Sequence, residues 1–286
     1  TNFGKMAISG NLGFILGPAL AGALGATIWG EIPPVVAALV ISAVASLIIA
    51  FKLPETGCAA RAVSPEPGTV GKALGQELKE CYELEGGSKL TMREILALPS
   101  IPLLLALYFL VFLAFNFFYI VFSVHAATIL EWSLAEIGAF FTFMGMAMVV
   151  VQGPILKRAS RVWSERALVI DGSLVLAVSF LFFTVDGKPQ AYIGTTLLAL
   201  GNGLMWPSLM ALLSMATGRE EQGAVQGFAS SGGAVASILG LLVGGLLYGV
   251  LGTGVFLLAF AITMIVMVLA MWLPSRAALP VGSAAL

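Results

Sequence analysis

The sequence predicts an all-α polytopic membrane protein with eight transmembrane helices, and three observations lead to this prediction. Hydrophobic residues make up 59% of the chain and charged residues only 10%, whereas a soluble domain carries about 25% charged residues. The mean hydropathy is +1.01. Apolar runs of about 20 residues, long enough to cross a bilayer, recur along the chain. A net charge of −1 gives no reason to expect a nucleic-acid partner, so the expected surroundings are lipid.

The apolar runs follow one another in a simple order. A short turn at 30–34 joins the first two, and a polar stretch at 53–98 separates these two from the other six. Within that stretch, 71–85 has the spacing of an amphipathic surface helix, and an ordinary solvated linker helix fits equally well. An even number of spans places both ends of the chain on one side. The predicted spans are 6–29, 34–52, 101–124, 136–156, 166–185, 191–215, 223–249 and 253–273.

The basic residues give the expected orientation. Of the 14 Lys and Arg residues in the chain, only Lys188 falls on the side opposite the N-terminus, the 54–98 loop and the tail. Cytoplasmic loops carry an excess of Lys and Arg. We therefore expect both termini and the 54–98 loop to be cytoplasmic.

The first span carries the most distinctive pattern in the chain. Its small residues recur every three to four positions, so they share one helix face, and Gly13-x-x-x-Gly17 would admit a second helix backbone to backbone. The segment resembles antiporter motif C of the major facilitator superfamily, found on the fifth helix of its drug:proton antiporters. A generic packing face is the alternative interpretation. The residues that match the motif are Gly4, Gly13, Gly17, Pro18 and Gly22, with Ala21 in place of a glycine.

The resemblance implies a domain organisation. Shifting the first span by 223 positions lays its glycines on those of 223–249, as expected if two six-helix halves repeat in parallel. The chain would then correspond to helices 5–12 of a twelve-helix fold that lacks its first four helices and is a monomer when complete. The expected parts are the last two helices of the N-terminal half at 1–53, a cytoplasmic linker at 54–98, the C-terminal half at 99–274 and a cytoplasmic tail at 275–286.

The loop between the spans 136–156 and 166–185 resembles the second-half copy of the superfamily's cytoplasmic loop motif. In this resemblance Gly153 opens the turn, basic residues follow, and an acid-base pair caps the next helix. Ser164 departs from the glycine usual before that pair. A basic loop that only sets topology explains the charge equally well. The motif residues are Gly153, Lys157, Arg158, Arg161, Glu165 and Arg166.

Aromatic and amide side chains indicate a candidate substrate cavity. Helical spacing places several of them on one face of the span 101–124, and such a mixture suits a small-molecule pocket. Helix packing with buried amides as interhelical contacts is the alternative. The candidate cavity residues are Phe112, Phe115, Asn116, Tyr119, Asn202, Trp206, Gln226 and Ser230.

Two ionisable residues inside or near the spans need an explanation. Asp171 lies about one and a half turns into the span 166–185, where Arg166 or a neighbouring basic residue is an expected partner. An acid there is a candidate structural clamp or proton site. His125 is the single histidine, so it cannot form a metal site alone; we expect it at the outer interface, and a proton relay is the alternative. Cys58 and Cys81 also show no spacing typical of a metal site.

The function expected from these features is transport. The chain offers no catalytic cluster, P-loop or G-x-S-x-G motif, so we predict no enzyme activity and no cofactor. The resemblance implies proton-coupled efflux of small amphipathic molecules across a bacterial inner membrane by alternating access, with the proton gradient as energy source. The alternatives are a nutrient facilitator or symporter of the same fold, or a non-transporting sensor or assembly protein. The substrate and the coupling acid are not specified.

Overall fold

The computed structural model describes residues 2–30, 32–52, 92–98, 100–217 and 222–273, with side chains from Gly13 onwards except that of Phe14. Helices make up the secondary structure of these residues. Each predicted span coincides with a helix, which confirms the all-α polytopic fold class. The elements are α1 (Asn2–Gly25), α2 (Ile32–Lys52), α3 (Met92–Ala97), α4 (Ile101–Thr128), α5 (Leu134–Val150), η2 (Val151–Ile155), α6 (Leu156–Ala159), α7 (Glu165–Phe182), α8 (Lys188–Met215), α9 (Gln222–Leu251) and α10 (Gly254–Ala270).

Several of these helices have the length and composition to cross a membrane. In the described part of the chain, five segments are both long and apolar enough: α2, α4, the continuous run Leu134–Ala159, α8 and α9. Ile15–Gly25 of α1 and all of α10 add shorter apolar helices. The 18 residues of α7 carry Glu165, Arg166 and Asp171 near one end.

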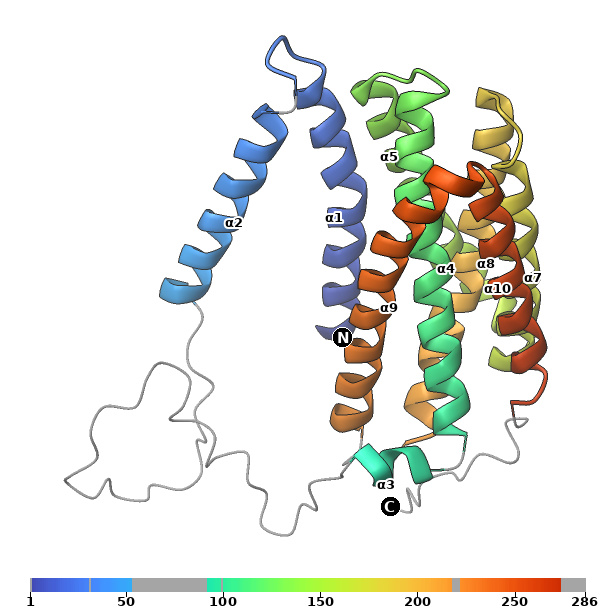
Figure 1. The fold of residues 1–286 in the computed structure, drawn as a ribbon. Coiled ribbons are helices and arrows are strands. Elements are labelled where there is room, and N and C mark those ends of the chain that lie inside the picture. The colour runs from blue at the N-terminus through green and yellow to red at the C-terminus, as the bar shows by residue number, and fades with distance from the viewer. Residues whose placement is uncertain (1, 31, 53–91, 99, 218–221, 274–286) are drawn as a thin grey trace, which may run out of the picture. The chain divides into compact units, whose positions relative to one another are not determined.

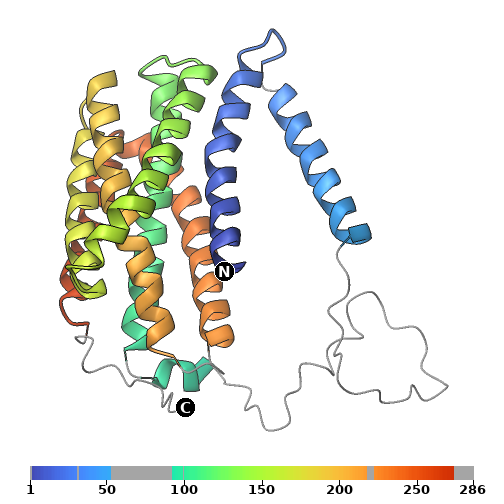
Figure 2. The ribbon, with the colours of Figure 1, turned by 180° about the vertical axis from the view of Figure 1, so that it is seen from behind.

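The chain forms two compact units, residues 1–34 with 91–286, and residues 35–90. In the second unit α2 is described, and none of its residues is buried. In the first unit, α4 packs against α9 and α10, α10 against α7, α7 against α8, and α8 against α5. The two opposite views in Figures 1 and 2 show these helices running alongside one another, with α1 next to α5.

Glycines set the closest helix contacts. Where α7 meets α8, a Cβ added to Gly172 would lie 2.8 Å from the Gly201 carbonyl oxygen, and one added to Gly201 would lie 2.4 Å from the Leu176 nitrogen. Any side chain at either position would meet backbone, so only glycine allows this approach. Small residues therefore hold the bundle together, as expected for helices in lipid.

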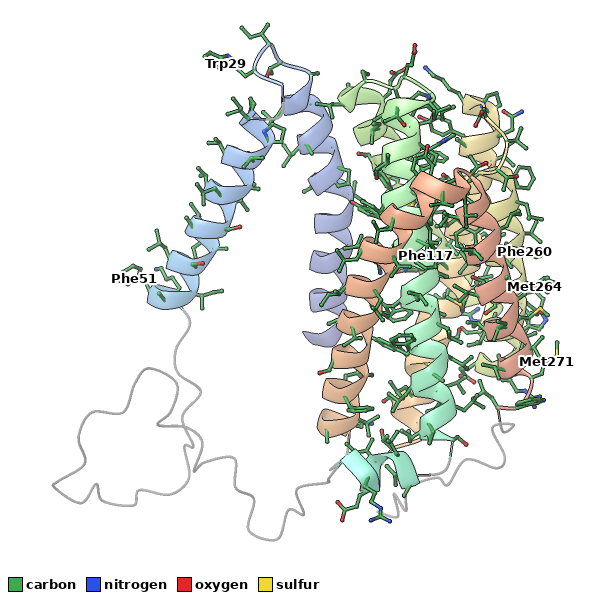
Figure 3. All side chains as sticks on the ribbon, viewed as in Figure 1. Trp29, Phe51, Phe117, Phe260, Met264 and Met271 are labelled. Carbon is green, nitrogen blue, oxygen red and sulfur yellow. The ribbon has the colours of Figure 1, made fainter. Side chains whose placement is uncertain are left out.

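The core of the first unit is rich in aromatic rings at one end. Other apolar side chains of this unit point away from the bundle. Phe122 stacks on Phe140 with ring centroids 4.2 Å apart, and Phe118 lies 4.7 Å from Phe183. Along α10, Phe256 is fully buried, whereas Phe260, Met264 and Met271 point away from the bundle (Figure 3). The helix α10 thus has one packed face and one face that points away from the bundle (Figure 3).

Candidate functional site

A cavity of about 250 Å³ lies between α4, the α5–η2 segment and α8. Its walls are apolar and aromatic apart from two amide side chains. This composition is typical of small-molecule pockets, where a few polar groups orient a mainly apolar ligand. The lining residues are Val111, Phe112, Phe115, Gly145, Met148, Val149, Gln152, Asn202 and Trp206.

Phe112, Phe115 and Trp206 form the aromatic wall of the cavity, and Tyr108, which does not line the cavity, packs against two of these rings. Trp206 lies edge-on to Phe112 at a centroid distance of 5.2 Å, and Tyr108 lies 4.9 Å from Phe112 and 5.0 Å from Trp206. Each pair falls within the range in which aromatic rings attract one another. The wall joins α4 to α8 with side chains that have little rotational freedom.

The amide wall depends on an irregular helix. Pro154 lacks an N–H and its ring clashes with the carbonyl four residues earlier in a regular α-helix, and the chain around it forms the π-helix η2. Gly203 of α8 packs against this turn, because a Cβ there would lie 2.6 Å from Val151 Cγ1. The π-helix places Gln152 on the cavity beside Asn202. Such irregular turns are frequent at functional sites.

The structure brings half of the sequence-predicted cavity residues together. Phe112, Phe115, Asn202 and Trp206 line the cavity. Asn116 turns instead toward α9, where its Nδ2 donates to Ser237 Oγ at 3.0 Å and to Phe112 O at 2.8 Å. This is the interhelical role that the sequence left as the alternative.

The other three candidates lie outside the cavity lining. Tyr119 is 38% exposed and its ring lies 4.8 Å from that of Phe141 on α5. Gln226 is exposed and contacts the Met210 sulfur. Ser230 lies beside the Tyr108 hydroxyl, and so adjoins the back of the aromatic wall.

The basic loop differs from the expected arrangement. Gly153 does not open a turn, because it lies inside η2 and the helical segment continues to Ala159. The turn follows at 160–163, and Lys157, Arg158 and Arg161 are exposed around it. Ser164 replaces the expected glycine as the N-cap of α7 and accepts from Ala167 N.

The acid-base pair after this turn has two roles. Glu165 lies in the first turn of α7, where a negative charge is favourable. Arg166 donates to the carbonyl oxygen of Met271 at the end of α10. The loop therefore connects the beginning of one helix to the end of another.

The small-residue face of α1 packs against α5. A Cβ on Gly22 would lie 2.9 Å from Gly138 Cα, and one on Gly138 would lie 2.7 Å from Pro18 O. Among the described residues, nothing lies within 4 Å of a Cβ built on Gly13 or Gly17. The close approach expected at Gly13-x-x-x-Gly17 therefore occurs one turn or more further on. Ala21 is exposed. Gly4 lies in the part of α1 whose side-chain surroundings are outside the described residues.

A sequence model of the Major Facilitator Superfamily matches residues 1–189 and 104–285, which together cover nearly the whole chain. The chain belongs to this superfamily. Its members are transporters that sit in lipid bilayers, and the all-α polytopic fold agrees with membership.

Several superfamily members are similar in sequence. Tetracycline resistance protein, class B, from Escherichia coli is 24% identical over 246 residues, 86% of this chain and 57% of that protein. Solute carrier family 67 member A1 from Homo sapiens is 27% identical over 269 residues, 88% of this chain and 57% of that protein. A crystal structure of the peptide transporter POT matches with a TM-score of 0.49 and 17% identity over 64% of this chain and 41% of its own. The chain thus spans a little more than half the length of the curated relatives.

Asp171 lies on the exposed face of α7 in this superfamily member. Leu174 and Val178, three and seven residues further on, are 44% and 37% exposed, so the acid stands at one end of an apolar stripe. Arg166, a partner expected for it, donates to Met271 O instead. Asp171 is also not among the residues that line the cavity.

Polar residues cluster at the opposite end of the bundle, near the α4–α5 and α7–α8 turns. Lys188 Nζ lies 2.5 Å from Glu136 Oε1, and Glu136 also closes a capping box with Ser133. Glu136 therefore belongs to the first turn of α5. His125, expected at the interface, is buried at 4% exposure and contacts Asp186 and Tyr248.

The sequence reasoning missed two features of this site. Gln152 could have been found from the sequence, because an amide followed by Gly153 and Pro154 interrupts an apolar run. The partners of His125 carried none, since Asp186 and Tyr248 are 61 and 123 residues away in the chain.

Proposed function

We propose that the protein is a secondary active transporter that exports small amphipathic molecules in exchange for protons. The observation that carries this proposal is the cavity beside Trp206. Its aromatic wall suits the apolar part of a substrate, and Gln152 and Asn202 supply hydrogen-bonding groups to orient it. The described residues that line it include no Asp, Glu, Lys or Arg, which favours a substrate bound mainly through its apolar surface.

We further propose that the chain corresponds to helices 5–12 of a twelve-helix transporter. Its length relative to the curated relatives supports this correspondence. In such transporters the substrate lies between two repeated halves. The cavity would then be the part of the substrate site that α4, α5 and α8 line, and α1 would lie at the seam between the two halves. The segment 153–166 would be the cytoplasmic loop motif. The termini would lie in the cytoplasm of a bacterial cell.

Transport assays on the full-length protein in vesicles test the proposal. With an imposed proton gradient, we expect export of tetracycline or ethidium that stops when the gradient is collapsed. Trp206→Ala removes the largest ring of the wall and should slow export by about tenfold. Asn202→Ala should alter the preference between the two compounds more than the rate for both. Trp29→Ala is the matched control, because Trp29 is 67% exposed on the α1–α2 turn.

The other outcomes are equally informative. Accumulation of a nutrient in the direction of the proton gradient would replace export by symport. Full activity of Trp206→Ala would separate the cavity from the substrate path. Absence of flux for any compound tested would favour a sensor or assembly role.

A further inference from the structure

His125 is buried among apolar rings yet holds a polar partner on each ring nitrogen. Its Nε2 lies 2.9 Å from Asp186 Oδ1 in the α7–α8 turn, and its Nδ1 lies 2.9 Å from Tyr248 Oη on α9. Phe256 of α10 covers it edge-on at 6.4 Å between ring centroids. The histidine side chain is 5% exposed, whereas that of Asp186 is 59% exposed. The network therefore reaches from the packed bundle to its surface.

The partners fix the proton positions. An ionised carboxylate can only accept, so His125 Nε2 carries a hydrogen and donates to Asp186. In the neutral ring Nδ1 is then an acceptor, and the Tyr248 hydroxyl donates a hydrogen bond to it. When Nδ1 gains a proton, the Tyr248 oxygen accepts instead, which requires only rotation of the hydroxyl. Both ring nitrogens of His125 therefore keep a hydrogen bond in either protonation state.

The charge balance also suits proton uptake. One proton added at Nδ1 changes the net charge of the His125–Asp186 pair from −1 to zero, and no bond to any other ligand is needed. Among the residues that the structure describes, the other titratable side chains at this end are Glu131 in the α4–α5 turn, Glu136, Lys188 and Tyr192. Glu136 and Lys188 neutralise each other, while α10 presents Phe256 rather than a charge.

We propose that His125 is a proton-binding site, with Asp186 fixing its tautomer and Tyr248 stabilising both of its protonation states. The site lies on the α4, α7–α8 and α9 elements, away from the cavity, at the end that the Lys and Arg distribution predicts to be outer. Proton binding here does not require substrate transport. Its failure and the failure of the proposed function are therefore separable.

Nuclear magnetic resonance of the full-length protein with ¹⁵N-labelled histidine tests the site, and His125→Gln assigns the signals. In the neutral ring we expect a single Nε2–H tautomer, and when the sample is acidified to pH 5 we expect Nδ1 to gain a proton. Asp186→Ala removes the acceptor and should cause loss of the single tautomer. Tyr248→Phe should shift the signal of unprotonated Nδ1, since that nitrogen loses its donor.

Glu136→Gln is the control. It breaks the neighbouring ion pair with Lys188 and should leave the His125 tautomer unchanged. Tyr248→Phe removes a single hydroxyl, so it remains informative if Asp186→Ala does not fold. Any of three results would overturn the proposal: a ring that stays neutral down to pH 5, a single Nε2–H tautomer that persists in Asp186→Ala, or an Nδ1 signal that is unchanged in Tyr248→Phe.

Discussion

At the scale of single residues, Asn116 shows how a polar group is accommodated in an apolar helix. Its amide donates both within α4, to Phe112 O, and across to Ser237 on α9. Gly240 allows this approach, because a Cβ there would lie 2.6 Å from Asn116 Cβ. A buried amide without a partner would be costly in lipid, so the contact specifies how α4 and α9 pack.

A double-mutant cycle measures this contact. We expect Asn116→Ala and Ser237→Ala to couple by about 0.6 kcal/mol, and by no more than about 1.7 kcal/mol, as for other hydrogen bonds between membrane helices. The measurement is the free energy of unfolding of the full-length protein in detergent.

Ser231→Ala provides the comparison for that cycle. Ser231 lies on the same helix, but its hydroxyl bonds to Gly227 O within α9. Its cycle with Asn116→Ala should be additive. Equal coupling in the two cycles would mean that Asn116 does not act through Ser237.

At the scale of elements, the sequence predicted the helices well and their contacts less well. Each apolar run became a helix because hydrophobic length alone decides whether a segment spans a membrane. Which glycine meets a neighbour depends on helix rotation, so Gly22 rather than Gly17 makes the close contact of α1. The π-helix at Pro154 shifts the register between α5 and α6. Periodicity alone does not contain this shift, and for that reason Gly153 was misplaced at a turn.

Four of the nine residues that line the cavity could be predicted from the sequence. Phe112 and Phe115 follow from helical spacing on α4. Gln152 reaches the cavity only because η2 widens the helix, and His125 finds partners only once three distant segments are folded together. Contacts between remote segments are set by packing and leave little trace in one sequence.

The packing of η2 on α8 leads to an element-scale prediction. Gly203→Ala places a methyl group against Val151, a clash expected to cost about 1–3 kcal/mol and to displace Gln152 from the cavity. Transport by the full-length protein should fall. Adding Val151→Ala makes room for the methyl group and should restore much of the rate.

Gly223→Ala is the matched control for that series, because nothing described lies within 4 Å of a Cβ at this position on α9. This variant should transport the substrate at the same rate as the parent protein. A loss in Gly203→Ala that Val151→Ala fails to recover would show that the helix contact is not the cause.

At the scale of the whole molecule, the contact between α1 and α5 has a direction. The two helices run antiparallel, and they touch from Pro18 to Gly25 on α1 and from Leu134 to Gly138 on α5. This is the end that carries the α1–α2 and α4–α5 turns, predicted to be outer. Further toward the other end, a Cβ built on Gly13 meets no described atom within 4 Å. If α1 and α5 belong to opposite halves, this arrangement is closed at the outer end.

A reversible cross-link at that end decides whether the closure is part of the transport cycle. A Cβ on Gly25 would lie 3.3 Å from Leu134 Cβ, close to the separation in a disulfide. In full-length protein with Cys58 and Cys81 replaced by serine, oxidation of the Gly25→Cys, Leu134→Cys pair should stop transport, and reduction should restore it. Alternating access requires the two halves to separate at each end in turn, so a bond across the outer contact holds one state. The Gly13→Cys, Leu134→Cys pair should neither cross-link nor respond to oxidation, because Gly13 lies about three helical turns from Gly25, the residue that meets Leu134. Transport at the full rate by the cross-linked protein would mean that α1 and α5 move as one body, and the seam between halves would then lie elsewhere.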